Sequence, residues 1–276
     1  MSAGVSIVVL SHERLGALRA LLESLLRQDT GGIPIELIVC NNSPSVELRA
    51  SVFSRLGRLF RRFPDVKIFN SSHNWLCRIR YTLATLARHD VILFLDDDLI
   101  PVDPGFVRKM AETLGTLGPN DILSCWTALW TRWDETHLTK VRMGFLYPQT
   151  TVLTECDYVG PGVSMFNKRI LFHPGLLDLA EEFHRSDSAW FPWVTTMELG
   201  SRKFYMPSYG MLRRHTEHTV KPLSDLPGFR AGQYAAYKTM WKRGYVPVLA
   251  TERHQGRDDS PEALAARTLR PQVDAW

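Results

Sequence analysis

The chain has 276 residues, of which 45% are hydrophobic and 22% charged, and its formal net charge at neutral pH is +4. This is the composition of an ordinary globular protein, with room for one large α/β domain or two small ones. The mildly basic balance suits an anionic substrate, but it is too weak to indicate a protein that binds nucleic acid.

The cysteines and the amino terminus suggest where the protein works. The four cysteines lie far apart and form no C-x-x-C pair, so a zinc site or a disulfide framework is not expected and a reducing compartment is the simpler interpretation. The amino terminus lacks the basic start and the cleavage site of a signal peptide, and no apolar run approaches the roughly 20 residues that span a bilayer. We expect a cytoplasmic protein, with peripheral contact to membrane-bound acceptors left open. The cysteines are Cys40, Cys77, Cys125 and Cys156.

The first hundred residues alternate between strand and helix patterns. Leucines in residues 15–28 recur on one helical face, and residues 46–62 form a basic amphipathic pattern. This regular order predicts a parallel sheet with helices on both faces. No G-x-G-x-x-G follows the first strand and no P-loop is present, which disfavours a dinucleotide site. The predicted strands are 5–10, 35–40, 66–69 and 91–95, and the predicted helices are 15–28, 46–62 and 75–88.

The second half of the chain has a different character, with clustered tryptophans and loops that contain glycine and proline. Strand-like segments cover residues 122–126, 151–153 and 158–166. We expect a nucleotide-binding half over residues 1–110 and an acceptor-binding half over residues 111–250 of the same domain. A C-terminal tail, residues 251–276, would follow; it is polar and acidic at its start, and we expect it to be mobile or to pack late.

Three consecutive aspartates, Asp96, Asp97 and Asp98, follow the apolar run Val91–Leu95. Ligands of open α/β sheets bind at the carboxyl ends of the strands, and three carboxylates repel one another unless a cation lies among them. Mg²⁺ and Mn²⁺ prefer such oxygen ligands and are often bound together with a substrate phosphate. Side chains alternate along an extended strand, so Asp96 and Asp98 should face one way and Asp97 the other.

A simpler interpretation is a solvated acidic loop that caps the next helix. Capping requires one carboxylate, and Asp103 before Pro104 already supplies it, with the proline at the first helical position. The metal interpretation is therefore preferred.

Five segments of the chain, taken together and in their order along the sequence, resemble GT-A glycosyltransferases of the exostosin-like and family-2-like groups. The resemblance implies a GT-A type α/β fold, with a Rossmann-like, mostly parallel sheet flanked by helices and an acceptor-binding C-terminal half. It also implies metal-dependent transfer of a sugar from a nucleoside diphosphate sugar, such as a UDP-sugar, to a hydroxyl acceptor that is a glycan, a lipid-linked molecule or another compound. The segments are Ile38–Ser43, Asn74–Tyr81, the D-x-D-type stretch Val91–Pro101, Tyr158–Asn167 and Ser186–Phe191.

The resemblance carries roles to individual residues. It makes Asp98 the ligand of Mn²⁺ or Mg²⁺ that bridges to the diphosphate, and Asp96 a contact of the ribose or the metal. Asp187 matches the carboxylate near the acceptor hydroxyl, where it acts as general base in an inverting enzyme and positions the acceptor in a retaining one. Two positions depart from the pattern: Ser186 and Cys40 stand where many members carry an acid.

Basic residues supply further candidates. Of Arg78 and Arg80, whose spacing prevents them from sharing a helix face, we prefer Arg80 as the phosphate contact. His215 is the preferred third metal ligand and His218 the alternative, although an exposed basic loop with no ligand role explains this cluster better, since a lone histidine is more often structural.

The remaining candidates line the expected donor site. Ser11, Arg14, Asn41 and Asn42 follow the first two strands and are candidate nucleotide contacts, although turn formation explains the asparagines nearly as well.

Two further residues belong to the expected sugar site. Trp190 is either a stacking surface for a sugar or part of the core. Gly162 either lets the backbone approach the sugar or forms a bend. Asp97 is included among the substrate contacts, with a structural role as the alternative.

Two other functions remain open on the sequence alone. A phosphotransferase of the haloacid-dehalogenase type would use Asp96 as a nucleophile, although its D-x-D normally ends the first strand. A non-catalytic module would bind a nucleotide sugar without turnover. A modified DNA base as acceptor is a narrower variant, supported only by the basic pI and the arginines of residues 46–62.

Overall fold

The computed structural model describes residues 4–44, 61–134, 137–146, 151–177, 187–215, 227–250 and 272–275. The strands are β1 (Val5–Ser11), β2 (Ile35–Asn41), β3 (Asp65–Asn70), β4 (Val91–Asp96), β5 (Leu99–Pro101), β6 (Ile122–Ser124), β7 (Trp126–Trp133), β8 (His137–Gly144), β9 (Thr154–Cys156), β10 (Tyr158–Val159), β11 (Val163–Asn167), β12 (Lys203–Tyr205), β13 (Leu212–Arg214) and β14 (Gln272–Ala275). The α-helices are α1 (Leu15–Leu25), α3 (Ile79–Thr85), α4 (Phe106–Leu114), α5 (Pro174–Leu177), α6 (Asp187–Leu199) and α7 (Phe229–Lys242). The short 3-10 helices are η1 (Leu76–Arg78), η2 (Lys168–Phe172) and η5 (Val248–Ala250).

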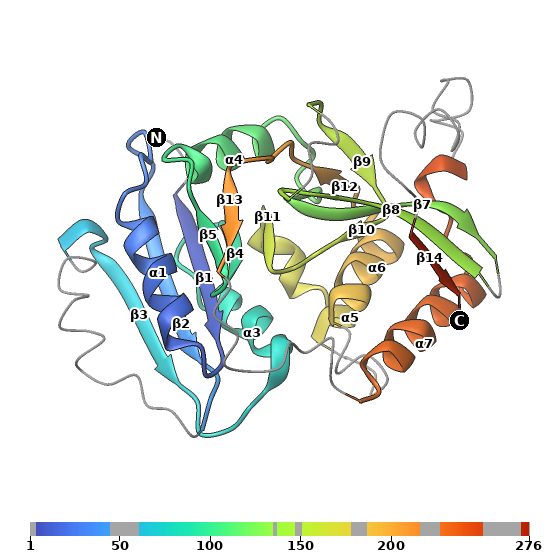
Figure 1. Cartoon of the computed structure of the whole chain (residues 1–276), viewed down its shortest axis with the longest axis horizontal. Helices are drawn as coiled ribbons and strands as arrows, with labels where there is room; N and C mark the ends of the chain where they lie inside the picture. The colour runs from blue at the N-terminus through green and yellow to red at the C-terminus, as the bar shows by residue number, and fades with distance from the viewer. Residues whose placement is uncertain are drawn as a thin grey trace.

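An eight-stranded sheet with the order β3-β2-β1-β4-β11-β6-β12-β9 forms the centre of the molecule (Figure 1). The first four strands are parallel, β11 runs antiparallel to both of its neighbours, β12 is parallel to β6, and β9 is antiparallel to β12. The sheet is therefore mixed and mostly parallel, which confirms the predicted fold class. Because strands from both halves of the chain join in one sheet, the two halves are built into a common structure.

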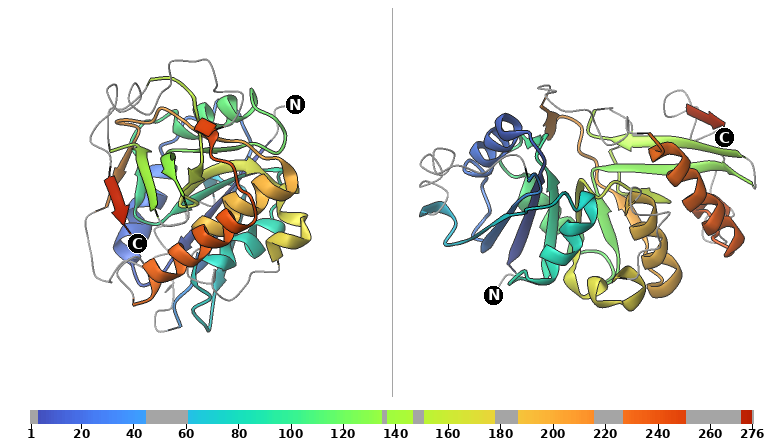
Figure 2. Two further views of the ribbon diagram at one scale, coloured as in Figure 1. Left: turned by 90° about the vertical axis from the view of Figure 1, so that its right-hand side faces the viewer. Right: turned by 90° about the horizontal axis from the view of Figure 1, so that it is seen from below.

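Two hydrophobic cores lie on the two faces of this sheet. Val5, Ile7 and Val9 of β1 pack with residues of α1 and α4, whereas Val8 and Leu10 pack with residues of α3 and α6. The alternation follows from the period of two along a strand, and a strand that is apolar on both faces requires helices on both faces. Figure 2 shows the helices on either side of the sheet.

A smaller sheet, β10-β7-β8-β14, extends the second half of the molecule. Stacked rings of Trp130 and Trp133, with centroids 4.5 Å apart, pack against Tyr237 of α7. Residues 272–275, within the predicted tail, pair with β8 and complete this sheet. The two predicted boundaries, after residues 110 and 250, stay predictions.

Most predicted elements of the first half are confirmed, whereas one segment of the first half and three of the second half differ. Residues 75–88 form η1 followed by α3, and residues 122–126 are interrupted at Cys125, between β6 and β7. The predicted strand 151–153 is wrong, since the strand begins at Thr154. Residues 158–166 form two strands in different sheets, because a turn at 160–162 redirects the chain. The predicted helix 46–62 lies outside the described residues, apart from its last two.

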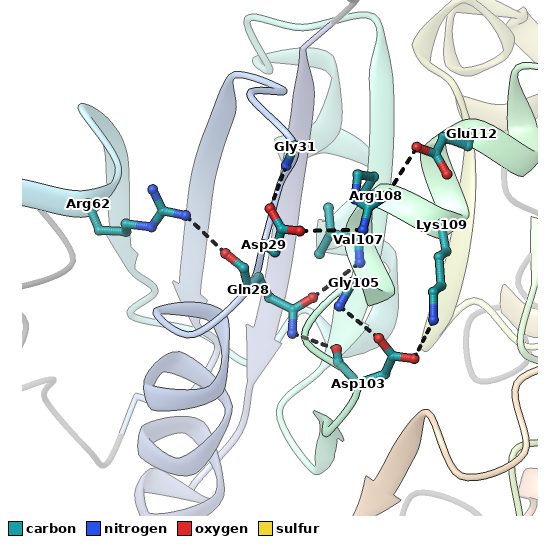
Figure 3. A network of polar contacts seen from close by, with 10 residues as sticks. All are labelled: Gln28, Asp29, Gly31, Arg62, Asp103, Gly105, Val107, Arg108, Lys109 and Glu112. Atoms are coloured by element: carbon teal, nitrogen blue, oxygen red, sulfur yellow. Dashed lines mark hydrogen bonds and ion pairs between the residues drawn. The ribbon is translucent and has the colours of Figure 1, made fainter.

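The start of α4 is held by a polar network rather than by a simple cap (Figure 3). The Gln28 side chain donates to the carbonyl of Asp103 at 2.9 Å and accepts from the backbone of Val107 at 3.2 Å. Asp103 accepts from the backbone of Gly105 at 2.7 Å and pairs with Lys109 at 2.6 Å. The prediction that Asp103 directly precedes the helix is wrong, because its carboxylate closes the turn before it.

Two further expectations concern membrane-spanning helices and disulfide bonds. No helix in the described parts of the chain is long and apolar enough to cross a membrane. All four cysteines lie within the described ranges, and no disulfide joins them.

Candidate active site

Polar residues end the four parallel strands at one edge of the sheet. The register pairs Ser11 with Asn41 and Asn41 with Asn70, and it pairs Leu10 with Asp96. The last residues of β1, β2, β3 and β4 therefore form a continuous row, which is the place where ligands of such sheets bind.

The three aspartates pair with arginines from other elements in a way that the sequence does not predict. Asp96 pairs with Arg80 at 3.0 Å, whereas Asp97 and Asp98 both pair with Arg14, at 2.5 and 3.0 Å. The expected alternation of Asp96 and Asp98 against Asp97 is wrong for these contacts, because β4 ends at Asp96 and the next two residues form a turn.

Asp97 is completely buried. Burial raises its pKa to about 7, and this shift is opposed by the charge of Arg14 and the hydroxyl of Ser11. Burial disfavours the charged form of Arg14 as well, but Asp97, Asp98 and Asp96 outweigh it and raise the Arg14 pKa. Asp97 is therefore a buried partner of Arg14, which favours the structural role considered as the alternative to a substrate contact. The Ser11 side chain, 1% exposed, belongs to the same buried group.

Asp98 connects the triplet to the second half of the chain. Its carboxylate Oδ2 accepts from Arg14 Nη1 at 3.0 Å and from Arg214 Nε at 3.3 Å. Its backbone carbonyl accepts from the His215 amide at 2.8 Å, because β13 pairs with β5 and places Arg214 opposite Leu99. The fold thus brings the predicted ligand His215 beside Asp98, although 116 positions separate Arg214 from Asp98. His218 lies outside the described residues.

Gly162 and Arg80 fix the position of Asp96. The Asp96 amide donates to the Gly162 carbonyl at 2.7 Å, and a Cβ on residue 162 would lie 2.1 Å from the Asp96 carboxylate. Arg80 is 4% exposed, and its guanidinium lies 5.7 Å from the centre of the Phe94 ring. Arg80 therefore reaches the site through Asp96, whose side chain is 34% exposed.

Asn42 holds the loop that precedes η1. Its Oδ1 accepts from the Trp75 amide at 3.0 Å, and its Nδ2 donates to Asn74 Oδ1 at 3.0 Å and to the Leu76 carbonyl at 2.9 Å. Leu76 has a φ of +56°, a left-handed conformation that costs a residue with a side chain about 1–2 kcal/mol. Asn42 is 2% exposed, so it supports the loop from the protein interior, whereas Trp75 is 44% exposed. Asn41 is likewise buried and donates to Asn70 Oδ1 at 3.2 Å.

The remaining candidates lie in or near α6. This helix begins at Asp187, of whose side chain the structure gives no description. Trp190 is 3% exposed and packs edge-on against Tyr81 with ring centres 6.3 Å apart. Trp190 is therefore part of the core, which is the alternative considered for it, because a buried ring has no face to offer a sugar.

The donor set suits a hard divalent cation in type. Asp96 and Asp98 offer carboxylate oxygens, and the backbone amide of His215, whose imidazole is a third ligand type, is bonded to the Asp98 carbonyl; Mg²⁺ and Mn²⁺ accept ligands of these types. Within the described ranges, however, no three acidic, histidine or cysteine side chains are already grouped to hold a metal. Asp96 and Asp98 are each paired with an arginine, so a cation would have to displace part of this network.

Sequence reasoning missed two members of the site. Asn70 ends β3 at the same edge as Asn41, and a polar residue directly after the run Val66–Phe69 was the available signal. Arg214 stands beside His215 in the printed sequence, but the local sequence gives no sign that it pairs with Asp98. That contact depends on the tertiary pairing of β13 with β5.

Comparison with known proteins identifies the family and the fold. Residues 6–172 match the family model described as Glycosyl transferase family 2. A structure of GalNAc-T7 with UDP, GalNAc and Mn2+ is similar with a TM-score of 0.60 and 12% identity, over 87% of this chain and 48% of that one. The chain thus spans about half the length of that protein. S. aureus TarS is similar with a TM-score of 0.49 and 14% identity, over 74% of this chain and 36% of that one. No curated protein matches the chain.

Proposed function

Because the chain belongs to Glycosyl transferase family 2, we propose that it transfers a sugar from a nucleoside diphosphate sugar to a hydroxyl group of an acceptor, with Mn²⁺ or Mg²⁺ at the aspartates. The observation that carries the proposal is the row of polar strand ends with Asp98 at its junction with the second half of the chain. Two arginines and the backbone of His215 meet at Asp98.

The donor would lie along this row. The ends of β1 and β2, near Asn42 and the exposed ring of Trp75, suit the nucleoside, since a polar loop and an aromatic face bind a flat base. The diphosphate would lie toward Asp96 and Asp98, where Arg14, Arg80 and Arg214 can neutralise it.

A bound divalent cation would be held by Asp98, Asp96 and His215, and would stabilise the negative charge of the diphosphate leaving group. The chain's own residues would provide the other functions. Asp96 is kept in place by Arg80 and Gly162, and Arg14 is kept in place by the buried Asp97. These contacts restrict the positions of Asp96 and Arg14 before the cation and the donor displace part of the network.

The acceptor would approach from the second half, at the start of α6. In an inverting reaction Asp187 would take the proton of the acceptor hydroxyl as general base, and in a retaining one it would position the acceptor. The acceptor remains a glycan, a lipid-linked molecule or another hydroxyl compound, and peripheral contact with a membrane would suit a lipid-linked one. A modified DNA base is a minor option.

Membership in this family sets aside the haloacid-dehalogenase interpretation. The position of Asp96 supports this conclusion, since its carboxylate is paired with Arg80 at 3.0 Å and packed against Gly162, rather than presented as a nucleophile.

A thermal-shift screen of nucleotide sugars, with and without Mn²⁺, tests the proposal. UDP-sugars are the first choice, because UDP and Mn2+ occupy the GalNAc-T7 structure. The true donor should raise the melting temperature only when Mn²⁺ is present, by mass action on the folded state. If a donor binds but no acceptor in a broad panel yields a product, the non-catalytic interpretation is favoured. If no nucleotide sugar stabilises the protein under either condition, the proposal fails.

A further inference from the structure

Asp98 has two arginine partners that are held very differently. Arg14 is fixed by a second contact, since its Nη2 lies 2.5 Å from an oxygen of the fully buried Asp97. Arg214 makes, among the described residues, one ion pair, with its Nε 3.3 Å from Asp98 and its side chain 51% exposed. Asp98 is largely buried, but it keeps Arg14 as a second partner at 3.0 Å, so loss of the Arg214 contact leaves no buried charge unpaired. Because the Arg214 side chain itself is half exposed, it can exchange partners at small cost.

The formal charges of the site balance without any ligand. Three carboxylates, Asp96, Asp97 and Asp98, face three guanidinium groups in direct contact. A divalent cation that enters alone makes this site positive. A cation that enters together with a diphosphate brings charges that largely cancel. Electrostatics therefore favour joint binding over binding of the cation by itself.

We infer that Arg214 is an exchangeable counter-ion for Asp98. It neutralises this carboxylate when the site is empty, and it turns to the phosphates of the donor when a cation takes its place on Asp98. The inference rests on the proposed function and adds to it a residue that couples the cation to the donor.

The position of Arg214 in the fold suits this exchange. It is the last residue of β13, and the next residue, His215, donates its backbone N–H to the Asp98 carbonyl at 2.8 Å. The backbone therefore stays attached to Asp98 while the side chain of Arg214 moves. Arg80 is a poor candidate for the same role, because it is 4% exposed and packed over Phe94.

A comparison of four proteins tests the inference: wild type, Arg214→Gln, Arg214→Lys and Arg213→Gln. Arg213 is the matched control, since it has the same charge on the same strand, is exposed, and forms no ion pair with the described carboxylates. The first readout is binding of Mn²⁺ alone, measured from the electron paramagnetic resonance signal of free Mn²⁺. The second is calorimetric binding of UDP or GDP in the presence of saturating Mn²⁺.

Removing the competing charge should strengthen binding of Mn²⁺ alone to Arg214→Gln by about tenfold or more. The same variant should bind the nucleoside diphosphate with Mn²⁺ more weakly, by about three- to tenfold, because one charged donor to the phosphates is lost. Arg214→Lys should behave like wild type toward Mn²⁺ alone, and Arg213→Gln should match wild type in both readouts.

Two results would overturn the inference. One is equal Mn²⁺ affinity of wild type and Arg214→Gln, and the other is an identical change in Arg213→Gln, which would reflect bulk charge. Because Arg214 is half exposed, a melting curve suffices to verify that the variant is folded. A different result would contradict the proposed function itself: in the presence of Mn²⁺, wild type would bind no UDP, no GDP and no nucleotide sugar of the donor screen.

Discussion

The backbone of Gly162 lies directly against the carboxylate of Asp96. The Gly162 carbonyl accepts from the Asp96 amide at 2.7 Å, and an added Cβ would come within 2.1 Å of Asp96 Oδ2. Glycine is therefore required at this position for steric reasons, and its role is to let β11 approach the end of β4. The side chain of Asp96 owes its orientation to this approach and to Arg80.

Replacement of Gly162 by alanine should damage the site without unfolding the protein. The new methyl group displaces the Asp96 carboxylate, and misplacement of a binding group by about 1 Å costs about 100-fold in activity. Gly115→Ala is the control, because the nearest atom to its added Cβ is a helix carbonyl oxygen at 3.3 Å. Steady-state rates and melting curves of both variants measure the effect. Unchanged activity in Gly162→Ala would contradict the close packing described.

Replacement of Asn42 by alanine should lower the free energy of unfolding by about 1–3 kcal/mol, since the part-buried backbone groups of Trp75 and Leu76 lose their partner. Asn42→Asp keeps the acceptor for the Trp75 amide but places an anion against two oxygen acceptors, so it should be at least as destabilising. Urea unfolding measures both values. If either variant is as stable as wild type, Asn42 does not support this loop.

Replacement of Asp187 by asparagine separates chemistry from donor binding. If Asp187 is the general base, the rate of transfer should fall by about 100-fold or more, while Mn²⁺-dependent nucleotide binding stays as in wild type. Ser188→Ala, at the next position of α6, is the control. A variant at position 187 that transfers sugar at the wild-type rate would remove Asp187 from the mechanism.

The buried Asp157 should give the stability a measurable pH dependence. Burial raises its pKa to about 6, against hydrogen bonds from the backbones of Trp130 and Val248 and other favourable contacts. The unfolded chain releases this proton near pH 3.9, so between about pH 4 and pH 6 the folded protein binds more protons. Asp157 therefore makes the protein less stable as the pH rises through this window, by about 3 kcal/mol in total.

Urea unfolding of wild type and Asp157→Asn at several pH values tests this sign. The difference in unfolding free energy, wild type minus variant, should fall as the pH rises from about 4 to 6 and stay level above it. A difference that rises over the same window would mean that the folded protein favours the charged form of Asp157.

The sequence predicts the elements near the site better than it predicts the contacts within it. Each of the first strands is a short apolar run with a polar end, so their positions and their common edge can be predicted from local pattern. The partnership of Arg14 with Asp97 and Asp98 cannot, because 83 and 84 positions separate these residues and only the parallel pairing of β1 with β4 brings them together.

The second half was harder to predict for a similar reason. Residues 158–166 are apolar enough to be one strand, but Gly160, Pro161 and Gly162 turn the chain between two sheets. The role of Trp190 could not be predicted from its position beside Asp187, since an aromatic residue there can equally stack on a sugar or belong to the core. Its burial follows from packing against Tyr81 of α3, which no local pattern in α6 reveals.

Titration of UDP, or of the best nucleoside diphosphate from the screen, into wild type and Asp98→Ala tests the central claim most directly. The quantity of interest is the gain in affinity on adding Mn²⁺, because loss of Asp98 leaves Arg14 and Arg214 able to attract phosphate without metal. We predict a large Mn²⁺-dependent gain for wild type and none for Asp98→Ala. An equal gain in both proteins would show that the aspartate triplet does not hold the cation of a sugar donor.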